Sequence, residues 1–349
     1  MAKATMKERL LLTGVAGGIG CHVVRHVMEN TDWDLVGIDS FRHKGWPDRV
    51  INAVQDHPEW KDRIEIFAYD LNAPFSSVFI KKLGRIDYII NMASLSDVED
   101  SITDPVPFIQ NNVNLVLNVL EYARVAQPGV FIQISTDEVY GPIENKTDKG
   151  MKEWDPFVPS NPYSASKLAQ EAIATSYWRT YNVPLIITNT MNNFGEMQSA
   201  SKYPSMVIDW LLRGEKITVH GTKHEDGTAE IGSRSYIHSR NFADALVWLI
   251  KNAPPHMHVP DSVDMPDRYN IAGDLQLDNL ELAKKIAEAM GRRDVQYEVV
   301  NVHTLRPGHD RHYGLDNTKL KELGWKSPLT FDESLKNTVE WYIKNPDWL

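Results

Sequence analysis

The chain has 349 residues, and its 37 Lys and Arg residues against 47 Asp and Glu residues give a net charge of -10 at pH 7. This length suits one large α/β unit with a smaller second lobe, and the charge repels a polyanion such as nucleic acid, so an anionic ligand must be held by a local group of cations. One cysteine, Cys21, excludes an internal disulfide, and no apolar stretch reaches the roughly 18 residues that span a bilayer, so we expect a soluble, unprocessed, cytoplasmic protein that binds no membrane.

Apolar runs typical of buried strands alternate with helical spacing as far as Thr190. The predicted strands cover residues 10–13, 34–38, 64–68, 88–91, 130–134 and 185–188. Segments between them carry apolar residues at helical spacing, as at 19–29, 108–124 and 162–181. Strands that alternate with helices in this way predict a doubly wound parallel sheet with helices on both faces.

Beyond Thr190 the pattern loosens, and the strands predicted at 216–220, 234–237 and 269–272 are short and separated. This change indicates a second, smaller lobe. A helical run at 239–251 is expected to return to the first unit. We therefore predict a first domain of residues 1–191, to which residues 236–263 return, and a C-terminal lobe made of residues 192–235 and 264–349.

A glycine-rich turn joins the first predicted strand to the following helix, with Gly14, Gly17 and Gly20 in the spacing G-x-x-G-x-x-G. Glycines at such a turn let the backbone approach a pyrophosphate, which the free N–H groups and the positive end of the helix then hold. Asp39 ends the second strand about 20 residues later, where a carboxylate reaches the ribose hydroxyls of adenosine and rejects a 2'-phosphate. These features predict a Rossmann-type dinucleotide site that takes NAD rather than NADP.

Two further segments bear on this cofactor site. Asp70 and Leu71, after the third strand, are expected to flank the adenine. The Arg-His-Lys sequence at 42–44 follows Asp39 closely and could receive a 2'-phosphate. While Asp39 is present, we interpret this segment instead as a solvated surface turn.

Tyr163 and Lys167 lie four residues apart in a segment with helical spacing, so both side chains are predicted on one face. An ammonium about 4 Å from a phenol favours the phenolate, and we expect Lys167 to bring the pKa of Tyr163 from about 10 toward roughly 7. Thr136, at the end of the preceding strand, can share a substrate oxygen with Tyr163. Together the three residues predict oxidation of a secondary alcohol by NAD, whereas a Tyr-x-x-x-Lys pair alone is also typical of two exposed helix residues.

Asp137 and Glu138 follow Thr136 directly and are expected to face the same ligand. Like charges at one site raise one pKa, which leaves a protonated acid beside a base. Once a hexose carries a ketone at C4, such a base can take the C5 proton while the acid protonates the departing C6 hydroxyl. The pair therefore predicts loss of water, with hydride returned to C6 and NAD regenerated. The alternative is that both carboxylates only cap the next turn.

Besides the glycine-rich turn, the chain contains a set of longer motifs, which are Ser135-Thr-Asp-Glu-Val-Tyr-Gly141, Pro159-Ser-Asn-Pro-Tyr163-Ser-Ala-Ser-Lys167, Asn192-Asn193-Phe-Gly195, Arg306-Pro-Gly-His-Asp310-Arg311, Leu323-Gly-Trp325 and Thr338-Val-Glu-Trp-Tyr342. Almost end to end, they resemble the extended short-chain dehydrogenases and, within them, the nucleotide-sugar 4,6-dehydratases, most of all the branch that acts on dTDP-glucose. The Thr-Asp-Glu triplet is the specific part, because related sugar epimerases and decarboxylases usually have other residues in the carboxylate positions.

The resemblance implies a role for each of these side chains. Thr136 and Tyr163 would hold the C4 oxygen, with Tyr163 as the base for oxidation. Lys167 would tune Tyr163 and bind the nicotinamide ribose. Asp137 would be the acid at C6, and Glu138 the base at C5.

The resemblance also implies NAD as the cofactor, a nucleotide-diphosphate sugar as the substrate and a homodimer formed through the helices at 108–124 and 162–181. Among substrates, dTDP-glucose is the first expectation and UDP-glucose the second. Positions expected to contact the sugar or its phosphates are matched by Ser96, Asn193, Lys202, Arg234, Asn270 and Arg306.

Some positions depart from the family pattern. Leu95 and Asp97 stand where a Glu and a His are usual, Glu196 stands where a Pro is usual, and residues 220–234 form a longer loop. The nucleotide base and the hexose therefore stay open. So do two other functions, a sugar-nucleotide 4-epimerase or decarboxylase and a nucleotide-binding protein without catalysis.

Two histidine pairs, at 220 and 224 and at 256 and 258, raise the question of a metal. Neither pair has a cysteine or a third ligand at fixed spacing. We predict that they are loop histidines and that the protein needs no metal.

Overall fold

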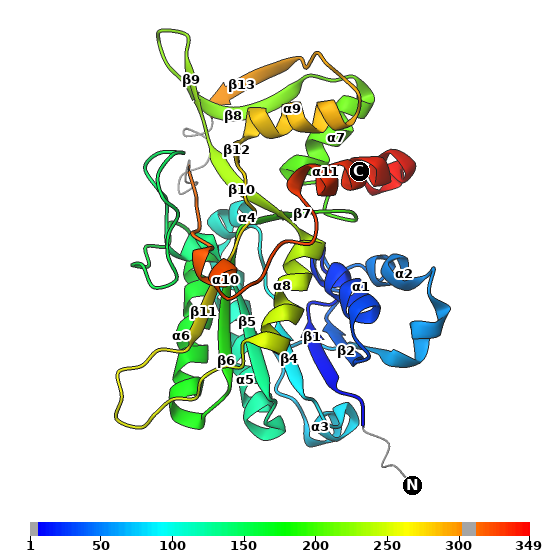
Figure 1. Ribbon diagram of the computed structural model, residues 1–349, viewed down its shortest axis with the longest axis vertical. Coiled ribbons are helices and arrows are strands. Elements are labelled where there is room, and N and C mark those ends of the chain that lie inside the picture. The colour runs from blue at the N-terminus through cyan, green and yellow to red at the C-terminus, as the bar shows by residue number, and fades with distance from the viewer. Residues whose placement is uncertain (1–5, 302–311) are drawn as a thin grey trace.

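The computed structural model describes residues 6–301 and 312–349, and its central layer is a parallel β-sheet (Figure 1). Within these residues, seven strands pair side by side in parallel. In spatial order they are β11 (Asp267–Ile271), β6 (Leu185–Thr190), β5 (Val130–Thr136), β4 (Tyr88–Asn91), β1 (Arg9–Thr13), β2 (Asp34–Asp39) and β3 (Ile64–Ala68). A strand that is covered on both faces needs a continuous apolar run, and every residue of β5 and β6 is buried.

Helices cover both faces of this sheet. One face carries α1 (Gly20–Asn30) and α8 (Ser239–Asn252), which pack on β1, β2 and β4. The other face carries α3 (Ser77–Leu83), α5 (Pro105–Ala126) and α6 (Pro162–Tyr181). This arrangement confirms the Rossmann-type doubly wound sheet predicted from the sequence. The helix expected near 239–251 is α8, which packs on this sheet beside α1.

The order of the strands creates the binding crevice. The chain winds outward from β1 toward β3 on one side and toward β6 on the other, so the direction of winding switches between β1 and β4. In open α/β sheets, ligands bind beside the carboxyl ends of the strands at such a switch point. The loops after β1, β2, β4 and β5 therefore converge on one crevice.

A second lobe lies above this edge of the sheet in Figure 1. Its strands form two small sheets among the described residues, with β10 (Ser233–His238) between β7 (Asn192–Phe194) and β12 (Gln276–Asp278), and β8 (Ile217–Lys223) between β13 (Tyr297–Asn301) and β9 (Ala229–Ile231). Its helices, which share one apolar core, are α7 (Tyr203–Arg213), α9 (Asn279–Ala289) and α11 (Phe331–Lys344). The shorter elements are α2 (Pro47–Val54), η1 (Pro58–Arg63), α4 (Val98–Thr103), η2 (Asp137–Val139), α10 (Thr318–Glu322) and η3 (Pro346–Trp348).

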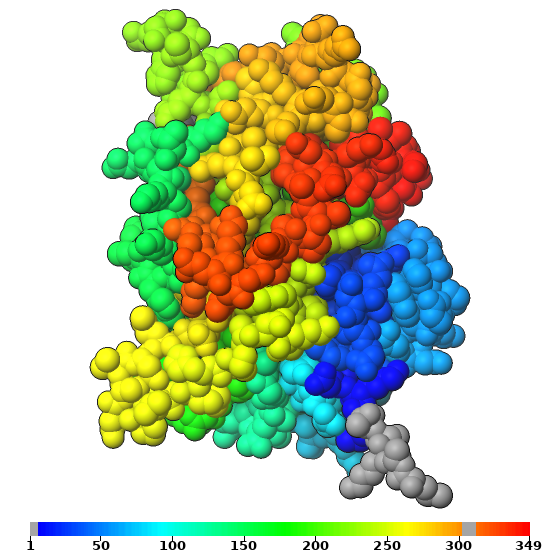
Figure 2. Space-filling model, in the orientation of Figure 1, coloured from blue at the N-terminus to red at the C-terminus, as the bar shows by residue number. Residues whose placement is uncertain are grey.

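The C-terminal segment lies against the N-terminal helices. Figure 2 shows the end of the chain, in red, in contact with the blue segment that contains α1 and α2. The ring of Trp348 lies 6.0 Å from the ring of Trp46, measured between centroids. This contact joins the second lobe to the first domain.

One predicted boundary is wrong at β11. The sequence places residues 264–349 in the second lobe, but β11 pairs with β6 in the central sheet. The apolar pattern of β11 is interrupted by Arg268, which is 1% exposed and pairs with Glu171 on α6 at 2.6 Å. The sequence did predict a strand at 269–272, but its short apolar run beside a charged residue gave no sign that it pairs within the central sheet. The rest of the domain division stays a prediction.

Across the described ranges 6–301 and 312–349, every helix is too short or too polar to cross a bilayer.

Candidate active site

A cavity of about 1070 Å³ occupies the crevice between the central sheet and the second lobe. Its walls include the glycine-rich turn, the ends of β2, β4 and β5, the start of α6 and parts of β7, α7 and β10. Most of the residues predicted for the cofactor, for catalysis and for the substrate line it, namely Gly14, Gly17, Gly20, Asp39, Asp70, Leu71, Ser96, Thr136, Asp137, Glu138, Tyr163, Lys167, Asn193, Lys202 and Arg234.

The glycine-rich turn closes tightly between β1 and α1. Gly14 has a φ of +72°, and its N–H donates to Ile38 O at 2.8 Å. A Cβ added at Gly20 would lie 2.2 Å from Gly14 O, so no side chain fits there without moving the turn. The turn therefore presents bare backbone and the N-terminal end of α1 to the cavity, which is the arrangement that a pyrophosphate requires.

Asp39 is held at the end of β2 beside this turn. Its carboxylate accepts hydrogen bonds from Ala16 N at 3.1 Å and from Phe41 N at 3.0 Å. These bonds tie the loop after β2 to the glycine-rich turn and place a negative charge in the cavity wall. A carboxylate here can accept hydrogen bonds from ribose hydroxyls, and its charge repels an added phosphate.

The segment at 42–44 is exposed, as predicted for a solvated turn, but two of its side chains also have charged partners. The guanidinium of Arg42 pairs with Asp70 at 3.0 Å, and Nζ of Lys44 pairs with Asp97 at 2.7 Å. Both cations line the cavity. The sequence did not indicate these two pairs, because each pair joins loops that follow different strands.

Thr136, Asp137 and Glu138 enter the cavity from the end of β5 and the short helix η2. Thr136 Oγ1 donates to Asp137 Oδ1 at 2.9 Å, and Asn161 Nδ2 donates to Glu138 Oε2 at 2.9 Å. Burial raises the pKa of Asp137 to about 6, although the hydrogen bond from Thr136 acts in the opposite direction. The two carboxyl groups are thus held by different partners, and Asp137 can carry a proton near neutral pH.

Tyr163 and Lys167 project from the first turns of α6. The helix begins there because Asn161 caps it: Asn161 Oδ1 accepts from Ser164 N at 2.9 Å, and Pro162 occupies the first position. Nζ of Lys167 donates to Ile134 O at 2.7 Å and to Gln170 Oε1 at 2.6 Å. Burial lowers the pKa of Lys167 to about 7.

The direction predicted for the pKa of Tyr163 is wrong. Loss of surrounding water raises this pKa above its usual value, and the charges of Glu138 and Asp137 raise it further. A hydrogen bond with Thr136 opposes these effects without reversing them. The ammonium of Lys167 is directed at the carbonyl of Ile134. Burial also lowers the pKa of Lys167, which disfavours its charged form. Lys167 therefore does not stabilise the phenolate as expected.

The second lobe contributes polar groups to the far wall of the cavity. Asn193 Nδ2 donates to Met191 O at 3.0 Å, while its buried Oδ1 accepts no hydrogen bond from a described residue. The guanidinium of Arg234 lies 4.6 Å from the centre of the Tyr313 ring. Lys202 Nζ lies 3.8 Å from Asp97 Oδ2.

One predicted substrate residue, Asn270, does not lie at the cavity, and another falls outside the described part of the chain. Asn270 is fully buried in β11, where Nδ2 donates to Met151 O at 2.8 Å and to Asp316 O at 3.0 Å. Its amide thus holds two loops together and does not line the cavity. Arg306 lies outside the described residues.

Some cavity residues had no signal in the sequence. Gln198 faces the glycine-rich turn, with its Cα 3.7 Å from where a Cβ on Gly18 would lie, and its Nε2 donates to Asn193 O at 2.6 Å. Tyr236 and Tyr313 also line the cavity. Their positions depend on how the two lobes meet, which local patterns do not encode.

The histidine pairs form no metal centre. In the part of the chain that the structure describes, no three His, Cys, Asp or Glu side chains are grouped to hold an ion. His256 Nδ1 lies 3.2 Å from Asp267, and His258 Nδ1 lies 2.7 Å from Asp264. These contacts fasten the loop before β11.

The chain is similar to known proteins over almost its whole length. Residues 11–338 match the family model described as GDP-mannose 4,6 dehydratase. The low-salt glycan biosynthesis protein Agl12 of Haloferax volcanii is 34% identical over 339 residues, which cover 96% of this chain and 98% of that protein. A dTDP-glucose 4,6-dehydratase of Salmonella typhimurium is 31% identical over 362 residues, which cover 98% of this chain and 94% of that protein.

Solved structures share the whole fold. DesIV, a dTDP-glucose 4,6-dehydratase of Streptomyces venezuelae crystallised with NAD, superposes with a TM-score of 0.81 at 28% identity and covers 97% of this chain and 98% of its own. A UDP-glucuronic acid 4-epimerase of Bacillus cereus, also with NAD, reaches the same TM-score of 0.81 at 20% identity and covers 97% of this chain and 99% of its own. The second likeness concerns the fold alone.

Proposed function

Because this chain belongs to the nucleotide-sugar 4,6-dehydratase family of the extended short-chain dehydrogenases, we propose that it is an NAD-dependent hydro-lyase that converts a nucleotide-activated hexose to the 4-keto-6-deoxy sugar. The observation that carries this proposal is the pair of carboxyl groups at the end of β5. Asp137 has a pKa raised to about 6 and Glu138 is held by Asn161, both beside Thr136 in the same cavity as Tyr163 and Lys167.

NAD fits the cofactor end of the cavity. The turn at Gly14, Gly17 and Gly20 would hold its pyrophosphate, Asp39 its adenosine ribose, and Asp70 with Leu71 would flank its adenine. Bound NAD supplies a hydride acceptor and, later, a hydride donor. Solved structures of relatives that contain NAD support this choice.

Tyr163 would remove the proton of the C4 hydroxyl, with Thr136 sharing the same oxygen. In the protein alone its pKa is raised, so Tyr163 holds its proton until positive charge enters the cavity and stabilises the phenolate. Lys167 would bind the nicotinamide ribose, for which its ammonium is already anchored on Ile134 O and Gln170.

Elimination would then use the two carboxyl groups in different roles. Glu138 would take the C5 proton, and Asp137 would protonate the departing C6 hydroxyl. With a pKa of about 6, Asp137 is protonated in about a tenth of molecules at pH 7. A sugar that fills the cavity removes further water and increases this fraction.

The substrate phosphates would meet the cations of the second lobe. Arg234 carries a fork of donors suited to a diphosphate, and Lys202 lies at the start of α7 on the same wall. These groups let a chain of net charge -10 bind an anionic substrate. The relatives favour dTDP-glucose as the hexose donor, followed by UDP-glucose, while Leu95 and Asp97 are the positions at which the sugar pocket can differ.

Mass spectrometry of the product tests the proposal. The NAD-loaded protein is incubated with dTDP-, UDP-, GDP- and CDP-hexoses, and we expect one of them to give a product lighter by one water without net formation of NADH. Intact substrates throughout the panel would refute the dehydratase. An isomer of unchanged mass would indicate a 4-epimerase, loss of CO2 a decarboxylase, and tight binding without turnover a non-catalytic protein.

A further inference from the structure

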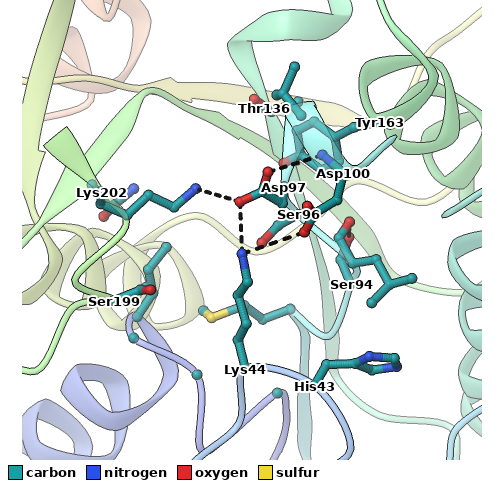
Figure 3. A pocket seen from close by; sticks show the side chains of 18 of the residues that line it. His43, Lys44, Ser94, Ser96, Asp97, Asp100, Thr136, Tyr163, Ser199 and Lys202 are labelled. Carbon is teal, nitrogen blue, oxygen red and sulfur yellow. Dashed lines mark hydrogen bonds and ion pairs between the residues drawn. The ribbon is translucent and has the colours of Figure 1, made fainter. Parts of the chain in front are cut away.

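Three charged side chains form a bridge across the cavity. Nζ of Lys44 lies 2.7 Å from Asp97 Oδ2, and Nζ of Lys202 lies 3.8 Å from the same oxygen. Figure 3 shows Asp97 between the two lysines, with Lys44 also 3.9 Å from Asp100. We call the Lys44–Asp97–Lys202 group the charged bridge.

The topology of the sheet sets what this bridge crosses. Lys44 lies in the loop between β2 and α2, and Asp97 follows β4 and caps α4. Because β1 lies between β2 and β4 in the sheet, a link from one loop to the other passes over the end of β1 and its glycine-rich turn. Lys202, at the start of α7, extends the link to the second lobe.

Both ends of the link are firmly placed. Behind Lys44, Trp46 N donates to Ala16 O at 3.0 Å, which fixes the loop to the glycine-rich turn. Asp97 uses its two oxygens separately, since Oδ1 accepts from Asp100 N at 3.3 Å to cap α4 and Oδ2 receives the lysines. The cap thus directs the second oxygen toward the cavity.

The bridge is charged but can open. Burial raises the pKa of Asp97, but the hydrogen bond from Lys44 and the charge of Lys202 outweigh this effect, and the net pKa lies below its usual value. The carboxylate is therefore ionised at neutral pH. The side chains of Lys44 and Lys202 are 50% and 41% exposed, and pairs with such exposed members are individually weak.

We infer that the charged bridge is a strap that retains NAD, and that Lys44 and Asp97 are positioning residues for the cofactor. This inference rests on the NAD site of the proposed function. A dinucleotide that extends from Asp39 to Tyr163 must run along the glycine-rich turn and so pass beneath the bridge. Retention suits the proposed reaction, because the hydride taken from a sugar has to be returned to that same sugar.

Dissociation of NAD in the absence of sugar tests the strap. Protein loaded with radiolabelled NAD is diluted into excess unlabelled NAD, and the retained label is followed by rapid filtration. We compare the wild type with Asp97→Asn, Lys44→Met and the double variant. Asn keeps the cap on α4, because its side-chain oxygen accepts the same bond. Lys285→Met is the matched control, since Lys285 pairs with Asp332 at 2.8 Å on the surface.

If the strap retains NAD, Asp97→Asn and Lys44→Met both accelerate dissociation, by about 3- to 10-fold, while Lys285→Met leaves it unchanged. The double variant then dissociates no faster than the faster single variant, because either change already opens the bridge. Opposite effects, with slower loss from Asp97→Asn and faster loss from Lys44→Met, would overturn the strap and leave only simple attraction of the phosphates by charge. Unchanged rates in both would also overturn it. Since no sugar is present, either result is independent of whether dehydration is the reaction.

Discussion

The hydroxyl of Thr136 donates a hydrogen bond of 2.9 Å to the carboxylate of Asp137, and both side chains are buried at the end of β5. This bond favours the ionised carboxylate, whereas burial favours the neutral acid. Burial has the larger effect, and the pKa of Asp137 rises to about 6. The proposed acid is therefore maintained at the expense of folding stability.

Replacement of Asp137 by Asn should stabilise the protein at neutral pH. The raised pKa means that the folded protein retains a proton that the unfolded chain loses between about pH 4 and about pH 6. The wild type therefore loses stability as pH rises through this window, and Asp137→Asn does not. We expect a gain of about 1–3 kcal/mol near pH 8 that disappears near pH 4, measured by urea unfolding at both values.

Asp32→Asn, at an exposed position, serves as the control and should show no such dependence. A gain for Asp137→Asn that is equal at both pH values would contradict the assignment of a buried acid. The same variant should lose dehydratase turnover by about 10²- to 10⁴-fold, because general acid catalysis is removed.

Glu138→Gln separates oxidation from elimination. Gln keeps an oxygen that can accept the bond from Asn161 Nδ2 but cannot take the C5 proton. We expect oxidation at C4 to proceed and turnover to fall by about 10²- to 10⁴-fold, so that reduced cofactor accumulates. The near-ultraviolet absorbance of NADH, followed in a single turnover, measures this accumulation. Tyr163→Phe is the comparison, because it should form no NADH; wild-type turnover in Glu138→Gln would remove Glu138 from the mechanism.

Local patterns predicted the parts of the site that lie close together in the chain. The apolar run at 130–134 and the polar residues after it place Thr136, Asp137 and Glu138 at a strand end, and β5 indeed extends to Thr136. The spacing of Tyr163 and Lys167 sets them on one helix face. Because the ends of parallel strands meet at one edge, these segments had to converge once the sheet was correctly identified.

The same reasoning could not predict contacts between residues that lie far apart in the sequence. The pKa of Tyr163 depends on where the ammonium of Lys167 points, and the carbonyl that receives it belongs to another strand. The pairing of Lys44 with Asp97 depends on the order of β2, β1 and β4. Periodicity records which residues are buried, but it does not record which charges a fold brings together.

Two neighbouring glycines allow a matched test of the phosphate turn. A Cβ at Gly20 would lie 2.2 Å from Gly14 O, whereas a Cβ at Gly18 would meet nothing closer than Gln198 Cα at 3.7 Å. We expect Gly20→Ala to displace the turn, to reduce the free energy of unfolding by about 1–3 kcal/mol and to weaken NAD binding at least about 10-fold. Gly18→Ala should change both quantities little. Calorimetric titration with NAD and urea unfolding measure them, and equal losses in both variants would contradict the steric argument.

A homodimer through α5 is the last prediction. Val106, Ile109 and Leu117 are 57%, 38% and 40% exposed, and their spacing puts them on one face of the helix. Water disfavours such a stripe, so we expect a second copy of the chain to cover it. Light scattering after size exclusion should give twice the mass of one chain for the wild type and the mass of one chain for Leu117→Asp. Val78→Asp on α3, where Val78 is 77% exposed, should stay dimeric, and a monomeric wild type would refute the interface.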